Sequence, residues 1–114
     1  MKKDYFYNAT VVSVYDGDTI RANIDLGFNT WLHNESIRLY GIDAPEIRGE
    51  ERPEGLKAKD WLSSILKPDT SFMLHSIKDN KEKYGRYLGI IYLDDVNLNE
   101  EMISLGLANR YMGS

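Results

Sequence analysis

The first 42 residues contain three strand-like segments and no helical pattern, and this order constrains the fold more than any other feature. Residues 10–15 are rich in β-branched side chains, and residues 19–26 alternate apolar and polar side chains with the period of a half-buried strand. The sequence Asp-Gly-Asp at 16–18 is typical of a tight hairpin turn. Residues 36–42 predict a third strand, which Ala-Pro at 44–45 ends. A parallel sheet is therefore disfavoured, because parallel strands need long crossover connections.

The middle of the chain is predicted to contain a loop and then a helix. Residues 27–34 fit no single pattern and are expected to include the end of the second strand and a loop. Residues 47–55 are charged and contain glycine and proline, which predicts an exposed, mobile loop. Residues 55–67 place large apolar side chains on one face, which predicts an amphipathic helix that ends before Pro68.

The last third adds two strands and a second helix. Strands are predicted at 71–77 and 87–93, and Asn97 with Glu100 forms a capping pair for a helix over 98–105. The whole order predicts an α+β chain that is mainly β, a five-stranded Greek-key barrel of the OB type with two helices. Barrels of this type often bind nucleic acids on one face.

Composition sets limits on the class of protein. A chain of 114 residues is expected to form one domain over residues 1–114. Cysteine is absent, which excludes disulfides and thiolate metal sites. Neither a membrane-spanning apolar run nor a secretory leader is present in the sequence, so we expect a cytoplasmic protein without a membrane partner. The net charge of −4 predicts that any contact with a nucleic acid is local and uses few phosphates.

Carboxylates follow two of the predicted strands. Asp18 closes the first turn, and Asp43 follows the third strand, so a small barrel can bring the two side chains together. Like charges in contact are unfavourable unless a cation joins them. Oxygen ligands alone favour Ca²⁺, with Mg²⁺ or Mn²⁺ less favoured. Arg38, in the strand that enters the second acidic turn, fits either a phosphate ligand or a structural ion pair with Asp18 or Glu46.

Four motifs together resemble one known family. These are Asp-Gly-Asp-Thr at 16–19, Ile-Arg-Leu-Tyr-Gly-Ile-Asp-Ala-Pro-Glu at 37–46, Lys-Tyr-Gly-Arg at 83–86, and an Asn-x-x-x-x-Met-Ile-x-x-Gly-Leu-Ala pattern at 97–108. In order and spacing they closely resemble the staphylococcal nuclease-like (thermonuclease) family over about residues 9–111. The resemblance implies an OB-type barrel and a calcium-dependent phosphodiesterase that acts on DNA and RNA. The best-known members continue through a third helix, which we do not expect in a chain that ends at Ser114.

The resemblance also implies roles for individual residues. Metal ligands would be Asp18, Asp43 and the main-chain carbonyl of Ala44, where the family's reference members have threonine. Catalytic residues would be Arg38 and Arg86, which bind the phosphate, and Glu46, which activates or orients water. Substrate-binding residues would be Lys83 and Tyr84, which hold a neighbouring phosphate, although the segment 83–86 is also compatible with a solvated hairpin turn.

Two other functions stay open at this point. One is a non-catalytic OB-fold module that binds nucleic acid, since the resemblance includes members that have lost activity. The other is a nuclease that works only after it has oligomerised or docked to a partner. The family resemblance implies a nuclease that leaves 3′-phosphate ends and has low sequence specificity. The low specificity fits contacts to the phosphate backbone, because these carry no information on base identity.

Overall fold

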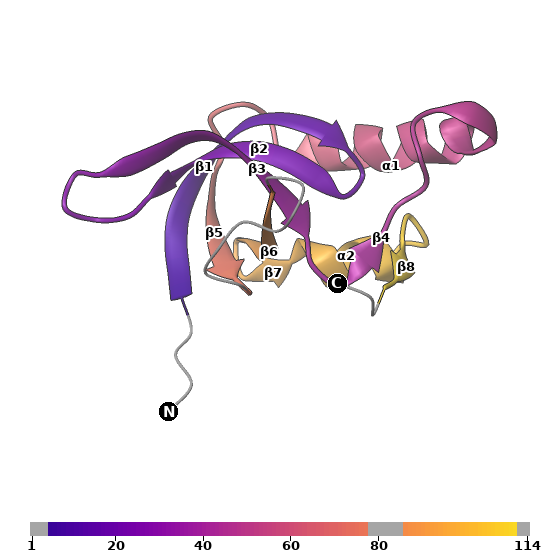
Figure 1. Cartoon of the computed structure of the whole chain (residues 1–114). Coiled ribbons are helices and arrows are strands. Elements are labelled where there is room, and N and C mark those ends of the chain that lie inside the picture. Colours follow the sequence, from indigo (N-terminus) through magenta and orange to yellow (C-terminus); the bar gives the residue numbers. More distant parts are fainter. Residues whose placement is uncertain (1–4, 78–85, 112–114) are drawn as a thin grey trace.

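Figure 1 shows a barrel of strands with two helices at its side, in a computed structural model that describes residues 5–77 and 86–111. The elements follow one another in a mainly β order that begins with a long hairpin. They are β1 (Tyr5–Asp16), β2 (Thr19–Asp25), β3 (Trp31–Leu39), β4 (Ile42–Asp43), η1 (Gly49–Glu51), α1 (Arg52–Ile65), β5 (Ser71–Ser76), β6 (Tyr87–Leu93), β7 (Val96–Asn97), α2 (Leu98–Ser104) and β8 (Asn109–Arg110).

The barrel closes through one parallel pair of strands. Antiparallel pairing gives the order β3-β2-β1-β5-β6, and β3 also pairs with β6 in parallel, so the sheet returns on itself. Strand β1 pairs with two strands: its residues 5–10 pair with β5, and its residues 9–16 pair with β2. Register shifts within the β1–β2 pair mark the irregularities that let such a strand bend. The predicted five-stranded OB-type barrel with two helices is confirmed.

The interior of the barrel is aliphatic and continues onto both helices. Inward-facing side chains from all five strands form one cluster with the buried residues of α1 and α2. The largest fully buried members are Val11, Ile20, Ile37, Leu39, Ile42, Leu62, Leu66, Ile91 and Met102. Trp61 packs against this cluster, as its helical position predicts.

Several boundaries differ from the prediction. The third strand, predicted over 36–42, ends at Leu39, because a turn at 40–41 separates it from β4. Strand β1 begins at Tyr5, and β3 begins at Trp31 because the polar segment 31–35 pairs with β2 although most of it is exposed. Helix α1 begins at Arg52, so the predicted loop over 47–55 already contains η1 and the first helical turn. Pro53 does not break α1, since proline is favoured in a first turn, where the backbone N–H lacks a partner.

Gly17 allows the β1–β2 turn to touch two other segments. A Cβ atom at this position would lie 2.8 Å from the Cβ of Ala44 and 2.8 Å from the Cβ of Ala58. Ala44 follows β4, and Ala58 lies in α1, so the turn, the end of β4 and the helix meet at one point. The absence of a side chain at 17 therefore sets how closely these segments approach.

We expect Gly17→Ala to destabilise the protein by ~1–3 kcal/mol, because an added methyl group overpacks a contact between rigid neighbours. Urea unfolding measures the effect. The double variant Gly17→Ala/Ala58→Gly removes one of the two clashes and should recover part of the loss. An unchanged free energy of unfolding in Gly17→Ala would contradict the tight contact.

Candidate functional site

Asp18 is a nearly buried carboxylate at the start of β2. Its Oδ2 accepts a hydrogen bond of 2.9 Å from the backbone N–H of Ala44, and its Oδ1 accepts one of 3.3 Å from the hydroxyl of Thr19. Burial raises the pKa of Asp18 to about 6, and the charge of Asp16 adds to this, whereas the Ala44 N–H and Arg38 act in the opposite direction. The ionised form is thus poorly solvated, and a cation would favour it.

Arg38 lies between two carboxylates. Its Nη1 is 3.6 Å from Oδ2 of Asp18, and its Nη2 is 3.7 Å from Oδ1 of Asp43. Nη1 also donates hydrogen bonds of 2.9 Å to the carbonyl oxygens of Leu39 and Ile42, which ties the end of β3 to β4. The structure thus brings both acids to one guanidinium and shows the Arg38–Asp18 ion pair that the sequence suggested as one alternative. No ion pair joins Arg38 to Glu46 in the part of the chain that the structure describes.

Asp43 and Ala44 differ in exposure although they are adjacent. The Asp43 side chain is 60% exposed, whereas Ala44 is buried against the β1–β2 turn. Strand β4 holds this segment through its antiparallel pairing with β8, in which Asp43 lies opposite Asn109. The ring of Tyr111, which follows β8, has its centroid 5.9 Å from Cζ of Arg38. One predicted metal ligand is therefore nearly buried, and the other faces solvent.

Of the other predicted residues, the structure describes Arg86 and Glu46. Arg86 is half-buried and directly precedes β6, two residues before Leu88, which pairs with Arg38. Glu46 is exposed three residues after Asp43, and its backbone N–H is bound by the side chain of Glu51. Lys83 and Tyr84 lie outside the described residues.

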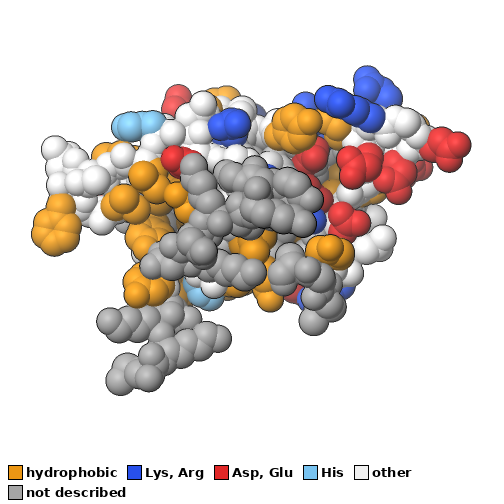
Figure 2. Space-filling model, in the orientation of Figure 1, with side chains coloured by type: hydrophobic (Ala, Val, Ile, Leu, Met, Phe, Trp, Pro, Cys, Tyr) orange, Lys and Arg blue, Asp and Glu red, His pale blue; other side chains and the backbone are white. Residues whose placement is uncertain are grey.

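Acidic side chains surround the exposed side of the site. Figure 2 shows them at the right of the view, over the region where Figure 1 places β4 and the start of α1. The exposed acids of this segment are Asp43, Glu46, Glu50, Glu51 and Glu54. In the described ranges no three Asp, Glu or His side chains converge closely enough to hold a metal ion. A hard cation here would thus need main-chain, water or substrate oxygens besides the carboxylates of Asp18 and Asp43.

Asn99 supports the site from α2 and was not among the residues predicted from sequence. Its buried Nδ2 donates to the carbonyl oxygens of Tyr40 at 2.9 Å and Gly89 at 3.1 Å, and its Oδ1 accepts from the N–H of Ile91 at 3.1 Å. One side chain therefore joins the turn after Arg38 to β6. A polar residue at a helical position flanked by core positions could have indicated this role.

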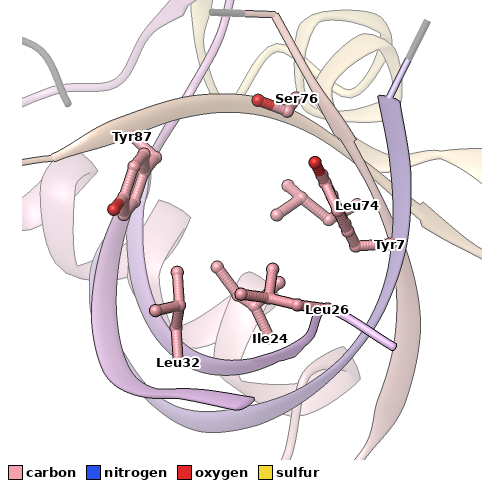
Figure 3. A pocket seen from close by; sticks show the side chains of 7 residues that line it. All are labelled: Tyr7, Ile24, Leu26, Leu32, Leu74, Ser76 and Tyr87. Atoms are coloured by element: carbon pink, nitrogen blue, oxygen red, sulfur yellow. The ribbon is translucent and has the colours of Figure 1, made fainter. Parts of the chain in front are cut away.

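A separate cavity lies inside one end of the barrel. It measures about 260 Å³, and Figure 3 shows its lining side chains pointing toward one another from β1, β2, β3, β5 and β6, with Leu26 just beyond β2. The lining residues are Tyr7, Ile24, Leu26, Leu32, Leu74, Ser76 and Tyr87. None of them is charged, so the cavity is unsuited to a phosphate or a hard cation, unlike the group around Arg38.

Comparison with known sequences identifies the family of the chain. Residues 36–114 match the family described as Staphylococcal nuclease homologue, which is well over half of the chain. The chain belongs to this family. The match includes Arg38, Asp43, Glu46 and the segment 83–86, so the resemblance predicted from the motifs is confirmed.

Several characterised and uncharacterised proteins are similar to the chain. Endonuclease Htp3 of Saprolegnia parasitica is 36% identical over 121 residues, which cover 91% of this chain and 56% of that protein. The Thermonuclease of Staphylococcus hyicus is 31% identical over 101 residues, covering 86% and 56%. An uncharacterised protein of Methanocaldococcus jannaschii is 30% identical over 132 residues, covering 95% and 61%. The chain thus spans 61% or less of the length of these relatives.

The described residues contain no helix that is both long enough and apolar enough to cross a membrane.

Proposed function

We propose that this chain is a calcium-dependent nuclease that hydrolyses phosphodiester bonds of DNA, and of RNA, with low sequence specificity, and leaves 3′-phosphate ends. Membership of the nuclease family supports hydrolysis of nucleic acids, as do the endonuclease and thermonuclease names of its relatives. The observation that carries the proposal is Arg38 of β3 held between Asp18, which directly precedes β2, and Asp43, which ends β4. This arrangement offers a planar guanidinium to a phosphate, and it offers two hard oxygen ligands to a metal ion beside that phosphate.

The residues that would hold Ca²⁺ are Asp18, Asp43 and the main-chain carbonyl of Ala44. The donor set fits a hard cation, because it consists of oxygen atoms alone. It also includes the carboxylate of Asp18, whose burial disfavours the charged form unless a cation lies beside it. When bound, the ion would neutralise phosphate charge and polarise the scissile P–O bond.

The side chains would then have separate roles in the reaction. Arg38 and Arg86 bind the non-bridging phosphate oxygens and stabilise the charge that builds on them. Glu46, which is exposed to solvent, takes a proton from the attacking water or orients it. Lys83 and Tyr84 hold a neighbouring phosphate. Contacts of this kind follow the backbone of the substrate, so sequence specificity should be low.

The test is cleavage of single- and double-stranded DNA by the pure protein in Ca²⁺, in Mg²⁺ or in excess EDTA. We expect activity with Ca²⁺, less or none with Mg²⁺, and none with EDTA. The reason is that the cation would neutralise the negative charge that builds on the phosphate in the transition state. The variant Glu46→Gln is the matched control for a contaminating nuclease, since it should lose turnover while the preparation stays the same. Cleavage that persists in EDTA would refute the metal dependence. DNA binding without cleavage under all conditions would support the non-catalytic module instead.

A further inference from the structure

We propose that Glu51 is a positioning residue for Glu46, acting with Gly55 through the start of α1. This inference rests on the proposed function, in which the Glu46 carboxylate acts on water. It concerns a residue that the family motifs do not include, five positions after Glu46 and exposed to solvent.

Three contacts hold the main chain around Glu46 against the beginning of α1. The backbone N–H of Glu46 donates a hydrogen bond of 3.1 Å to Oε1 of Glu51. Nη1 of Arg52 donates one of 3.2 Å to the carbonyl oxygen of Ile47. At Gly55 a Cβ atom would overlap the carbonyl group of Glu46, so the helix approaches this peptide as closely as a glycine permits. The main chain of Glu46 is therefore fixed on both its N–H and its C=O side.

The contact of Glu51 is not the usual use of an acid at this place. Glu51 is the N-cap of α1, a position at which Asp, Asn, Ser or Thr commonly binds an N–H of its own helix, and Glu51 makes no such capping bond. Its carboxylate instead reaches back to the N–H of another acid. The hydrogen bond is charge-assisted, so it holds the N–H of Glu46 more strongly than a neutral acceptor would.

The contact between Glu51 and Glu46 suits a positioning role, because the segment 44–46 is short and is held at both ends. Ala44 is bound through its N–H to Asp18, Pro45 has a fixed φ, and Glu46 is bound through its N–H to Glu51. The Glu46 carboxylate thus starts from a main chain that is fixed relative to Asp18 and Arg38. For a group that must orient a water molecule, a displacement of about 1 Å can cost a large factor in rate.

The test compares Glu51→Ala, Glu51→Gln and Glu50→Ala. We expect Glu51→Ala to lower kcat on the order of 10-fold with KM and the calcium requirement unchanged. Glu51→Gln should keep most of the turnover, because its amide oxygen still accepts the hydrogen bond from Glu46. Glu50→Ala removes the same charge from the residue before Glu51 and should leave kcat at the wild-type value. In a Glu46→Ala background, Glu51→Ala should cause no further loss.

A second measurement does not depend on activity. By NMR, the amide of Glu46 should exchange faster with solvent in Glu51→Ala than in wild type and Glu51→Gln. If the wild-type protein cleaves nothing, the proposed function fails, while this exchange still reports the contact. The positioning role is overturned if Glu51→Ala keeps wild-type kcat, if Glu51→Gln is as slow as Glu51→Ala, or if the Glu46→Ala background shows the same loss.

Discussion

Arg86→Lys and Arg38→Lys are each expected to lower kcat on the order of 10²-fold or more, the largest effect on turnover that we predict. Lysine keeps the positive charge but lacks the planar fork that binds two phosphate oxygens together. Loss of one preorganised donor to the transition state has a cost of this size in other enzymes. Steady-state turnover of a defined oligonucleotide at saturating Ca²⁺ measures it, and Arg21→Lys on β2 is the matched control.

The two variants should differ in stability. Arg38 also ties the end of β3 to β4 through two carbonyl oxygens, so its replacement should lower Tm as well as kcat. Calcium affinity should fall much less than turnover, because neither arginine ligates the metal. Lower Tm with wild-type turnover would make these arginines structural partners of the neighbouring acids and would favour the binding module.

Asp18→Asn is expected to be more stable than wild type in the absence of metal and less stable than wild type in saturating Ca²⁺. Asparagine can still accept the hydrogen bond from the N–H of Ala44, but it carries no charge into the buried position. In EDTA at pH 7 the variant should therefore be more stable than wild type. In saturating Ca²⁺ the wild type should be the more stable of the two, since a ligand that binds only the folded state stabilises it by mass action.

The pH dependence follows from the pKa of Asp18. Its folded value of about 6 exceeds the ordinary value of 3.8, so the folded protein holds this proton more tightly than the unfolded chain does. The metal-free wild type should lose stability as pH rises from about 4 to about 6, by at most about 3 kcal/mol, and Asp18→Asn should not.

Urea unfolding in EDTA at pH 4 and pH 7 measures the difference between wild type and Asp18→Asn. Asp43→Asn is the control, because it removes a charge from a side chain that is 60% exposed and should lower calcium affinity without a comparable gain in metal-free stability. Equal calcium-induced shifts in Tm for wild type and Asp18→Asn would contradict the proposed metal site.

Local patterns were sufficient to predict the elements that form the barrel. The alternation over 19–26 and the Asp-Gly-Asp turn specify the β1–β2 hairpin, and Asn97 caps α2 through its side chain as predicted, accepting from the N–H of Glu100 at 3.0 Å. The strand character of residues 31–35 was missed because this segment pairs with β2 without the alternation that burial on one face produces.

The start of α1 was missed for a different reason. Pro53 and Gly55 resemble loop residues, yet one occupies the first helical turn, and the other is small because the carbonyl group of Glu46 lies against it. That requirement comes from a tertiary contact. The same limit applies to the site, where the motifs predicted Asp18, Arg38 and Asp43 but not the contacts of Glu51 or Asn99, which depend on where two helices dock.

The parallel pairing of β3 with β6 makes the order of folding matter to the site. It joins Arg38 to Leu88, residues about 50 positions apart, and this distant closure is slow to form because the intervening chain must first lose its freedom. The two acids lie on the segments that end at β4, whereas Arg86 directly precedes β6 and comes to lie beside β3 only when β6 docks. A partly folded chain in which β6 and the following segments are detached would lack the second arginine, and it would also lack β8, which holds Asp43 through β4. Closure of the barrel between β3 and β6 is therefore also the step that would complete the proposed phosphate site.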